Sequence, residues 1–218
     1  MSLSKKVFFL SEAYKLHGLP GFIRTLAAGI RYKNCKRLIL VALSNPRRIE
    51  KAITASKNHD FHFATPNELR EMKEIDEYQI ADIDIERVEK DIARCLVQWD
   101  GDKLTGYAWV WVSKLAYIDD GVYLTLPDDA IYNYKALTLP EYRGLAFQGL
   151  RHLKLLELLK GEGVNRLFGF VDHFNIRSLQ GVKKSGYSPV GELVIRKTNN
   201  QVTSKLKLQT DFWPGKPI

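Results

Sequence analysis

The strongest pattern of apolar and polar positions lies between Tyr134 and Gly163. A mostly apolar run at 134–139 predicts a strand, and a short turn beginning at Pro140 follows it. Leucines then recur at helical spacing, which predicts a helix with one face packed on a sheet: Leu150, Leu153, Leu156 and Leu159, with Leu155 and Leu158 beside them. Gly161 and Gly163 are expected to end this helix.

The turn before this helix has the composition of a phosphate-binding turn. Gly144, Ala146 and Gly149 are small and leave neighbouring backbone N–H groups accessible. The helix N-terminus adds a partial positive charge at the same place. A turn that only connects two elements would use the same residues, so both interpretations stay open at this point.

A short apolar run at 165–171 predicts a second buried strand. Because a helical crossover joins it to the first strand, the two are expected to be parallel. Asp172, His173, Phe174 and Asn175 follow this strand, and a short helix then ends at Ser185-Gly186-Tyr187.

The rest of the chain predicts further strands and helices. Strands are expected at 37–43 and 61–65, and a hairpin with an Asp-Gly turn at 95–112. A helix should begin at Pro66, with Thr65 as N-cap and Glu68 completing a capping box. The run at 121–126 is expected to join 132–139 in an antiparallel meander.

The N-terminal part of the chain predicts two helices, at 4–17 and from Pro20 onward. The second is basic and amphipathic, a pattern that is typical either of a helix covering part of the core or of one on a membrane surface. We divide the chain into a basic extension of two helices and a strand (1–57), a core (58–197) and a C-terminal strand and tail (198–218).

The order of these motifs resembles the GNAT superfamily of N-acetyltransferases. Its phosphate turn, Q/R-x-x-G-x-G/A after a strand ending in x-Pro, matches Arg143, with Ala146 and Gln148 at the glycine positions. Its later N-x-x-A/S motif and its G-F pair match Asn175 with Ser178 and Gly186 with Tyr187. The run 61–69 is similar to the opening of that family's core, and Gly106-Tyr107 to its central strand.

The resemblance implies an α/β (α+β) fold with a mostly antiparallel sheet, one parallel strand pair and flanking helices, preceded here by the N-terminal helical extension. It also implies that acetyl-CoA or another acyl-CoA binds. The backbone at Leu137 and Leu139 would bond pantetheine, and Asn175 would lie beside it or beside the thioester. The pyrophosphate would be held by the N–H groups of Arg143, Gly144, Leu145, Ala146, Phe147 and Gln148.

Two positions depart from the family pattern. Gln148 stands where a small residue is usual, and Val182 stands where many members carry the Tyr that protonates the departing thiolate. Candidates for proton transfer are therefore Glu141 and His173 as the base, with Asp172 or a water chain as alternatives, and Tyr187 as the acid. A thiolate that leaves without a dedicated acid is the other option.

Charge is unevenly distributed along the chain. Residues 1–57 contain 12 Lys and Arg against 2 Asp and Glu, whereas the whole chain has a net charge of +8. The basic segment predicts an acidic partner, either an acyl carrier protein or an anionic membrane surface, unless its lysines are simply solvated. Without a recognition motif, nucleic acid is not expected.

Ten carboxylates between Glu68 and Asp91 make that region acidic, which suits either a cationic amine acceptor or a solvated face. The acceptor would be a small molecule or a protein amine, and a homodimer stays open.

Cysteine usage and hydropathy indicate a soluble, cytoplasmic protein. Only Cys35 and Cys95 are present, without a CxxC pair or clustered histidines, so neither a disulfide framework nor a metal site is expected. No apolar run approaches the roughly 20 residues needed to span a bilayer.

We therefore predict an acyl-CoA-dependent N-acyltransferase that most simply uses acetyl-CoA. A long-chain acyltransferase supplied by a carrier protein and a non-catalytic binding module on the same scaffold are the alternatives.

Overall fold

The computed structural model describes residues 35–43, 50–198 and 201–208. The two helices expected at 4–17 and from Pro20 lie outside the described residues. The strands are β1 (Cys35–Leu43), β2 (His59–Phe63), β3 (Ala93–Asp100), β4 (Lys103–Trp111), β5 (Leu115–Asp119), β6 (Val122–Thr125), β7 (Ala130–Thr138), β8 (Arg166–Asp172), β9 (Tyr187–Lys197) and β10 (Val202–Leu208). The α-helices are α2 (Glu50–Ala55), α3 (Pro66–Lys73), α4 (Asp82–Glu89), α5 (Phe147–Leu159) and α6 (Ile176–Lys184), with 3-10 turns at Asp76–Tyr78, Pro140–Tyr142 and Lys160–Glu162.

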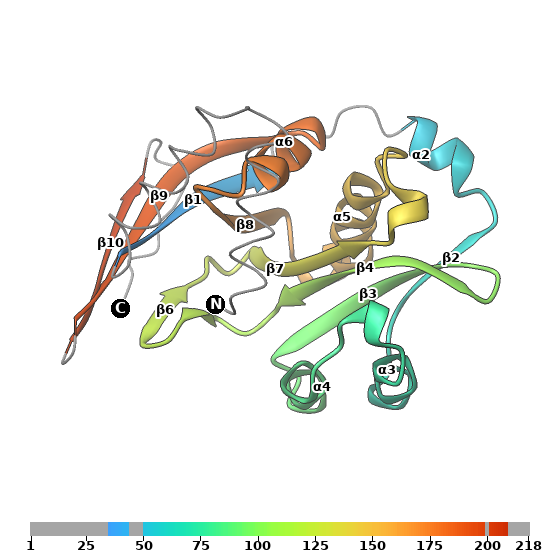
Figure 1. Ribbon diagram of the computed structural model, residues 1–218, viewed down its shortest axis with the longest axis horizontal. Coiled ribbons are helices and arrows are strands. Elements are labelled where there is room, and N and C mark those ends of the chain that lie inside the picture. Colours follow the sequence, from blue (N-terminus) through green and yellow to red (C-terminus); the bar gives the residue numbers. More distant parts are fainter. Residues whose placement is uncertain (1–34, 44–49, 199–200, 209–218) are drawn as a thin grey trace.

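Eight strands form one twisted sheet in the order β10-β9-β1-β8-β7-β4-β3-β2 (Figure 1). All neighbouring pairs in it are antiparallel except β7 and β8, which are parallel. The crossover between these two strands is α5, as a parallel connection requires. The structure thus confirms the predicted fold class of a mixed α/β protein with one parallel strand pair.

Helices cover both faces of the sheet. In Figure 1, α5 and α6 lie on one side, and α3 and α4 on the other. The α5 side is packed with aliphatic residues such as Val110, Ile131, Leu155 and Leu167. The α3 and α4 side is richer in aromatic residues, among them Trp109. The paired part of β7 and β8 is buried on both faces, with Ile131 and Leu167 in the α5 cluster and Tyr132 and Phe168 in a cluster with the β5–β6 hairpin.

Strand β1 lies in the interior of the sheet. It pairs with β8 on one side and with β9 on the other, and most of its residues from Leu38 onward are buried. At the far end, β10 pairs with β9. The sheet therefore runs across both of the domain boundaries drawn from the sequence, while the division of the chain into three parts stays a prediction.

The β5–β6 hairpin corrects one predicted pairing. The run at 121–126 was expected to pair with 132–139, but β6 pairs with β5 in a separate two-stranded sheet, and β7 pairs with β4. Apolar side chains explain this arrangement, because Ala116, Leu124 and Leu126 pack against the main sheet and are buried there. The hairpin therefore packs on one face of the main sheet and does not add a strand to it.

Helix α3 begins as the sequence predicts, with one difference at its cap. Thr65 is the N-cap, and its hydroxyl accepts a hydrogen bond from the Glu68 amide at 3.2 Å. The Glu68 carboxylate does not complete a capping box, because it contacts the His62 ring at 3.0 Å and accepts from Trp99 Nε1 at 3.2 Å. A tertiary contact has thus replaced the local one.

Candidate functional site

The parallel strands β7 and β8 separate halfway along their length. They are paired from Ala130 with Arg166 to Asn133 with Gly169. Beyond this point β8 continues to pair with β1 as far as Asp172, and β7 continues to pair with β4 as far as Thr138. Residues 134–138 of β7 and 170–172 of β8 are therefore not paired with each other along their facing edges.

A β-bulge marks the point of separation. Trp109 pairs with Lys135 and Val110 with Asn133, so Tyr134 is an extra residue in β7. The Asn133 side chain stabilises the bulge, since its Nδ2 donates to Trp109 O at 2.8 Å and to Lys135 O at 3.3 Å. The bend turns β7 away from β8 and opens the sheet on the α5 side.

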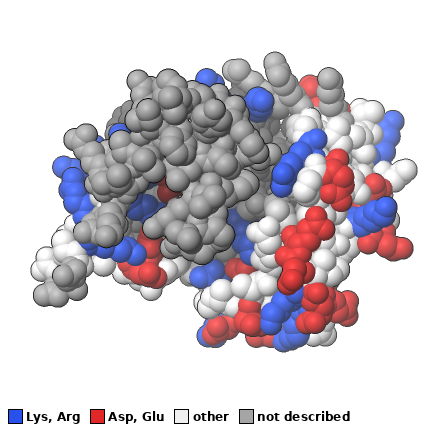
Figure 2. Space-filling model, viewed as in Figure 1, with Lys and Arg blue, Asp and Glu red and all other residues white. Residues whose placement is uncertain are grey.

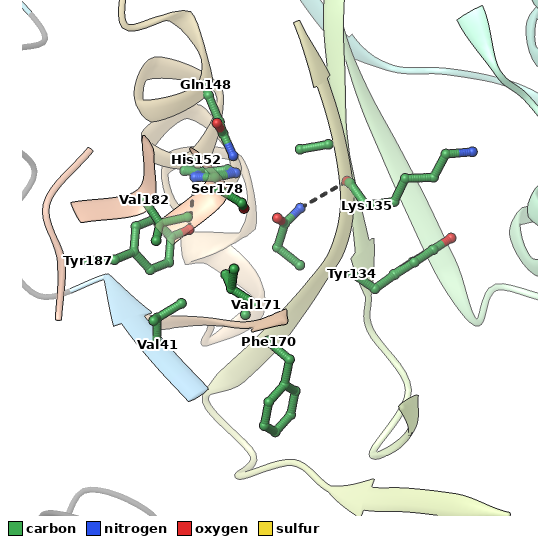
Figure 3. Close-up of a pocket in the computed structure, with 13 residues that line it drawn as sticks. Val41, Tyr134, Lys135, Gln148, His152, Phe170, Val171, Ser178, Val182 and Tyr187 are labelled. Carbon is green, nitrogen blue, oxygen red and sulfur yellow. Dashed lines mark hydrogen bonds between the residues drawn. The ribbon is translucent and has the colours of Figure 1, made fainter. Parts of the chain in front are cut away.

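A cavity of about 110 Å³ lies at this opening (Figure 3). Its walls come from β7, β8, α5, α6, β1 and the start of β9. The apolar part of the lining includes Val41, Val171 and Val182, and the polar side chains that line it include Gln148, His152, Ser178 and Tyr187. Lys135 also lines the cavity, but Figure 3 shows its side chain directed away, where Nζ contacts Asp84 Oδ2 at 2.7 Å.

His152 and Tyr187 form a buried pair at the wall of the cavity. Tyr187 Oη lies 2.8 Å from His152 Nδ1, and only 1% of His152 and 5% of Tyr187 are exposed. His152 Nε2 has no hydrogen-bond partner among the described residues. Burial and the nearby Arg151 charge lower the pKa of His152 to about 3, and burial raises the pKa of Tyr187, so both groups are neutral at physiological pH.

Sequence reasoning missed His152 because the leucines suggested a different buried face of α5. Leu158 is 45% exposed, whereas Arg151 and His152 are buried together with Leu155 and Leu159. The available signal was position: His152 lies three residues before Leu155 and seven before Leu159, on the stripe that faces the sheet. A polar residue on that stripe indicates a buried polar contact.

The neighbouring Arg151 fixes the end of β7. Its guanidinium is fully buried and donates to Gln98 Oε1 at 2.8 Å, to Leu137 O at 2.9 Å and to the Thr138 hydroxyl. Burial lowers its pKa to about 9, which still leaves it charged at neutral pH. The backbone at Leu137 was expected to bond pantetheine, but its carbonyl is already bonded within the protein.

The turn between β7 and α5 has the backbone shape of an anion site. Gly144 (φ +88°) and Ala146 (φ +60°) both adopt left-handed conformations, and Ala146 is the N-cap of α5 without a capping side chain. The amides of Phe147, Gln148 and Gly149 form no hydrogen bonds with described residues. A left-handed residue directly before a helix turns its successive N–H groups toward one point, where an anion is favoured.

Other residues assigned to this turn lie around it. Arg143 is exposed, and its Nε donates to Thr138 O at 3.1 Å. Leu145 is 39% exposed, whereas Phe147 is buried and packs on Ala52 and Leu150. Gln148, which departs from the family pattern, projects into the cavity (Figure 3) and does not fill the turn. Leu139 is buried, and its amide donates to Thr105 O at 3.0 Å.

The remaining predicted residues do not line the cavity. Glu141 is exposed in the 3-10 turn after β7. Asn175 is the N-cap of α6, where its Oδ1 accepts from the Ser178 amide at 3.0 Å. His173 is half-buried beyond the end of β8, and burial, with a smaller contribution from Arg37, lowers its pKa. The roles assigned to them from the sequence stay predictions.

The region at α3 and α4, which the sequence suggested is acidic, carries both negative and positive side chains. Figure 2 shows acidic and basic side chains interspersed over this part of the surface. Several of its carboxylates are paired, as in Arg70 with Glu89, Lys73 with Asp82, Lys90 with Glu86 and Lys135 with Asp84.

Within the described ranges, no three His, Cys, Asp or Glu side chains are placed to hold a metal ion. None of the described helices is long and apolar enough to cross a membrane.

Comparison with known proteins gave structural similarity only. No protein-family model matches the sequence, and no curated protein matches it either. Among solved structures, an aminoglycoside acetyltransferase, meta-AAC0020 from an uncultured soil metagenomic sample, in complex with sisomicin, is 13% identical, with a TM-score of 0.46 over 61% of this chain and 89% of that chain. AAC(6')-Iy, in complex with a bisubstrate analogue of CoA, is 10% identical, with a TM-score of 0.46 over 59% and 90%.

The PaiA N-acetyltransferase from Thermoplasma acidophilum, in complex with coenzyme A, is 12% identical, with a TM-score of 0.44 over 69% of this chain and 99% of that chain. TM-scores below 0.5 at such low identity do not establish an activity. Whatever function is assigned to this chain therefore has to rest on its own cavity, turn and buried polar groups.

Proposed function

We propose that the protein is an acyltransferase that takes an acyl group from an acyl-CoA thioester and transfers it to an amine. The observation that carries this proposal is the opening between β7 and β8, which joins a turn with the backbone shape of an anion site to a cavity with buried polar groups. A nucleotide-linked thioester needs these features in the same order, because its charged and reactive ends lie at opposite ends of an extended arm.

Each part of such a ligand has a counterpart in the chain. The free amides at the start of α5 suit the pyrophosphate. The edge of β7 at 134–136, which β8 no longer pairs, offers backbone groups to the amides of an extended pantetheine arm. The cavity beyond it, lined by Val171, Val182 and Tyr187, suits the thioester and its acyl group.

The transfer forms a C–N bond and breaks the C–S bond, while the amine loses a proton and the thiolate gains one. Groups that hold the carbonyl oxygen and supply the proton must therefore face the thioester. Val182 lines the cavity but cannot donate a proton. Tyr187 also lines the cavity and carries a hydroxyl, so Tyr187 is the proposed acid. The base and the acceptor amine stay open, because neither Glu141 nor His173 lines the cavity.

The size of the cavity favours a short acyl group. Its volume of about 110 Å³ is small, since pockets that enclose drug-sized ligands measure roughly 300–1,000 Å³. An acetyl group suits this space better than a long fatty acyl chain from a carrier protein. Acetyl-CoA is therefore the proposed donor.

Thermal unfolding with and without CoA ligands tests the proposal. Acetyl-CoA at about 100 times its dissociation constant should stabilise the protein by roughly 2.7 kcal/mol. CoA should stabilise it similarly, and a long-chain acyl-CoA should do so less, because the cavity is small.

A pair of variants at Gly144 locates the phosphate. A Cβ there meets nothing within 4 Å, and its φ of +88° strains Asp and Asn similarly. Gly144→Asp places a negative charge at the turn and should abolish the acetyl-CoA effect, whereas the uncharged Gly144→Asn should retain most of it. Absence of stabilisation in the unmodified protein would refute the proposal. If both variants bind acetyl-CoA equally well, the phosphate does not bind at this turn.

A further inference from the structure

The His152 imidazole has one nitrogen that the protein satisfies and one that it does not. Nδ1 lies 2.8 Å from Tyr187 Oη, whereas Nε2 is buried and has no partner among the described residues. Leaving a buried polar atom unpaired is costly, and such atoms are rare unless a ligand or water completes them. Figure 3 shows the ring between Gln148 and Tyr187, two other residues that line the cavity.

The state of the ring determines what the unpaired nitrogen offers. Burial and the Arg151 charge lower the pKa of His152 to about 3, so the imidazole is neutral and carries a single N–H. The Tyr187 hydroxyl can donate a hydrogen bond, and an unprotonated sp² Nδ1 can accept it. With Nδ1 accepting from Tyr187, the single hydrogen lies on Nε2, so the unpaired nitrogen of this cavity-lining residue is an N–H donor.

We infer that this Nε2–H donates a hydrogen bond to the carbonyl oxygen of the acyl thioester and stabilises the negative charge that develops there during transfer. His152 is then a catalytic residue that touches the reacting group. Tyr187 becomes a positioning residue, because its one hydroxyl hydrogen points to Nδ1 and holds the tautomer; to act as the acid it would have to turn this hydrogen to the thiolate. The inference rests on the proposed function, because it requires a thioester in this cavity.

The surroundings suit an oxyanion donor better than a base. A histidine that stays neutral down to acidic pH is a weak proton acceptor, but its N–H still polarises a carbonyl. The ring is fixed on α5 and buried, so the donor needs no reorganisation and acts in a medium of low dielectric constant. The nearby Arg151 charge strengthens the positive potential at this wall.

The first test needs no variant and no acceptor. In the full chain labelled with ¹⁵N at histidine, the side-chain shifts of His152 should show a protonated Nε2 and an unprotonated Nδ1 at neutral pH. Its signal is assigned by its absence in His152→Gln. A protonated Nδ1 would overturn the inference, because Nε2 would then present a lone pair to the carbonyl.

The second test observes the carbonyl directly. Acetyl-CoA with a ¹³C-labelled carbonyl is bound to the full chain, and its stretching frequency is compared by isotope-edited infrared difference spectroscopy. The frequency should be higher in His152→Leu, which lacks a donor, than in the unmodified protein. In His152→Gln, whose amide places an N–H near the same point, it should lie closer to the unmodified value.

Three outcomes separate the inference from the proposed function. If acetyl-CoA does not bind the unmodified protein, the proposed function fails and the inference fails with it. If it binds but the frequency is the same in His152→Leu, the inference alone fails. If the frequency rises while affinity changes little, hydrolysis of bound acetyl-CoA should also be about 100-fold slower in His152→Leu, the effect of losing one oxyanion donor.

Discussion

Gly106 lies where the fold and the candidate site depend on the same close contact. It is opposite Thr138 in the β4–β7 pair, near the end of β7 that Arg151 holds. A Cβ on Gly106 would lie 2.2 Å from Leu137 O and 3.0 Å from both Thr138 Cα and Arg151 Nη1. Because two of these three atoms belong to the backbone, Gly106→Ala can be accommodated only if β4 and β7 move apart.

The size of the effect follows from that movement. An ordinary contact requires the strands to separate by about 1 Å, which lengthens an N–H···O bond beyond its useful range. Two ladder bonds at roughly 0.5–1.5 kcal/mol each and the charged Arg151 bond to Leu137 O at roughly 1.5–3 kcal/mol would be lost. We therefore expect Gly106→Ala to lower the free energy of unfolding by about 3–6 kcal/mol, a large part of the stability of a typical domain.

Urea denaturation followed by circular dichroism measures this change, with Gly181→Ala as the matched control. Gly181 lies inside α6, and a Cβ there meets nothing within 4 Å. The same substitution at this helical position should therefore stabilise the protein by about 0.5–1 kcal/mol. If Gly106→Ala unfolds within about 1 kcal/mol of the unmodified protein, the close contact of β4 with β7 is not a constraint and the reasoning fails.

Two further predictions concern the start of α3 and the strand before it. Thr65→Ala removes the hydroxyl that accepts from the Glu68 amide and should cost about 1 kcal/mol in urea denaturation, whereas Thr65→Ser should cost little; equal losses would show that the cap does not matter. His62 titrates between Asp60 and Glu68: burial lowers its pKa, but hydrogen bonds and charge from the two carboxylates outweigh this and raise it above 6.5. The folded state therefore holds the proton more tightly, so this stabilisation is complete below about pH 6.5 and is lost as the pH rises through the folded pKa. His62→Gln should remove that part of the pH dependence of unfolding, and an unchanged profile would contradict the assignment.

The candidate site has a tyrosine at a different position from the one that the family pattern gives. Val182, the expected place of a hydroxyl, lines the cavity as an apolar residue. A tyrosine that lines the cavity is found instead at the start of β9, where the Tyr187 hydroxyl contacts His152 of α5. Replacing Tyr187 by Phe would therefore remove both the proposed acid and the partner of His152 Nδ1.

Local chemistry in the sequence was enough to predict several elements. The Asp100-Gly101 turn predicted the hairpin of β3 and β4, and Gly101 has the positive φ that such a turn requires. Thr65 and Pro66 located the start of α3. The crossover helix predicted that β7 and β8 are parallel, because only a long connection allows it. In each case the interaction involves residues close in sequence or a rule of connection.

Long-range contacts set the features that depend on residues far apart in the chain. The place of β1 between β8 and β9, the bulge at Tyr134 and the buried face of α5 were not determined by any short stretch. An apolar strand fits equally well beside several partners, and a helix with leucines on most sides can bury more than one face. Local sequence therefore predicted several elements and the turn at Gly144, whereas long-range packing brought His152 and Tyr187 together at the opening between β7 and β8.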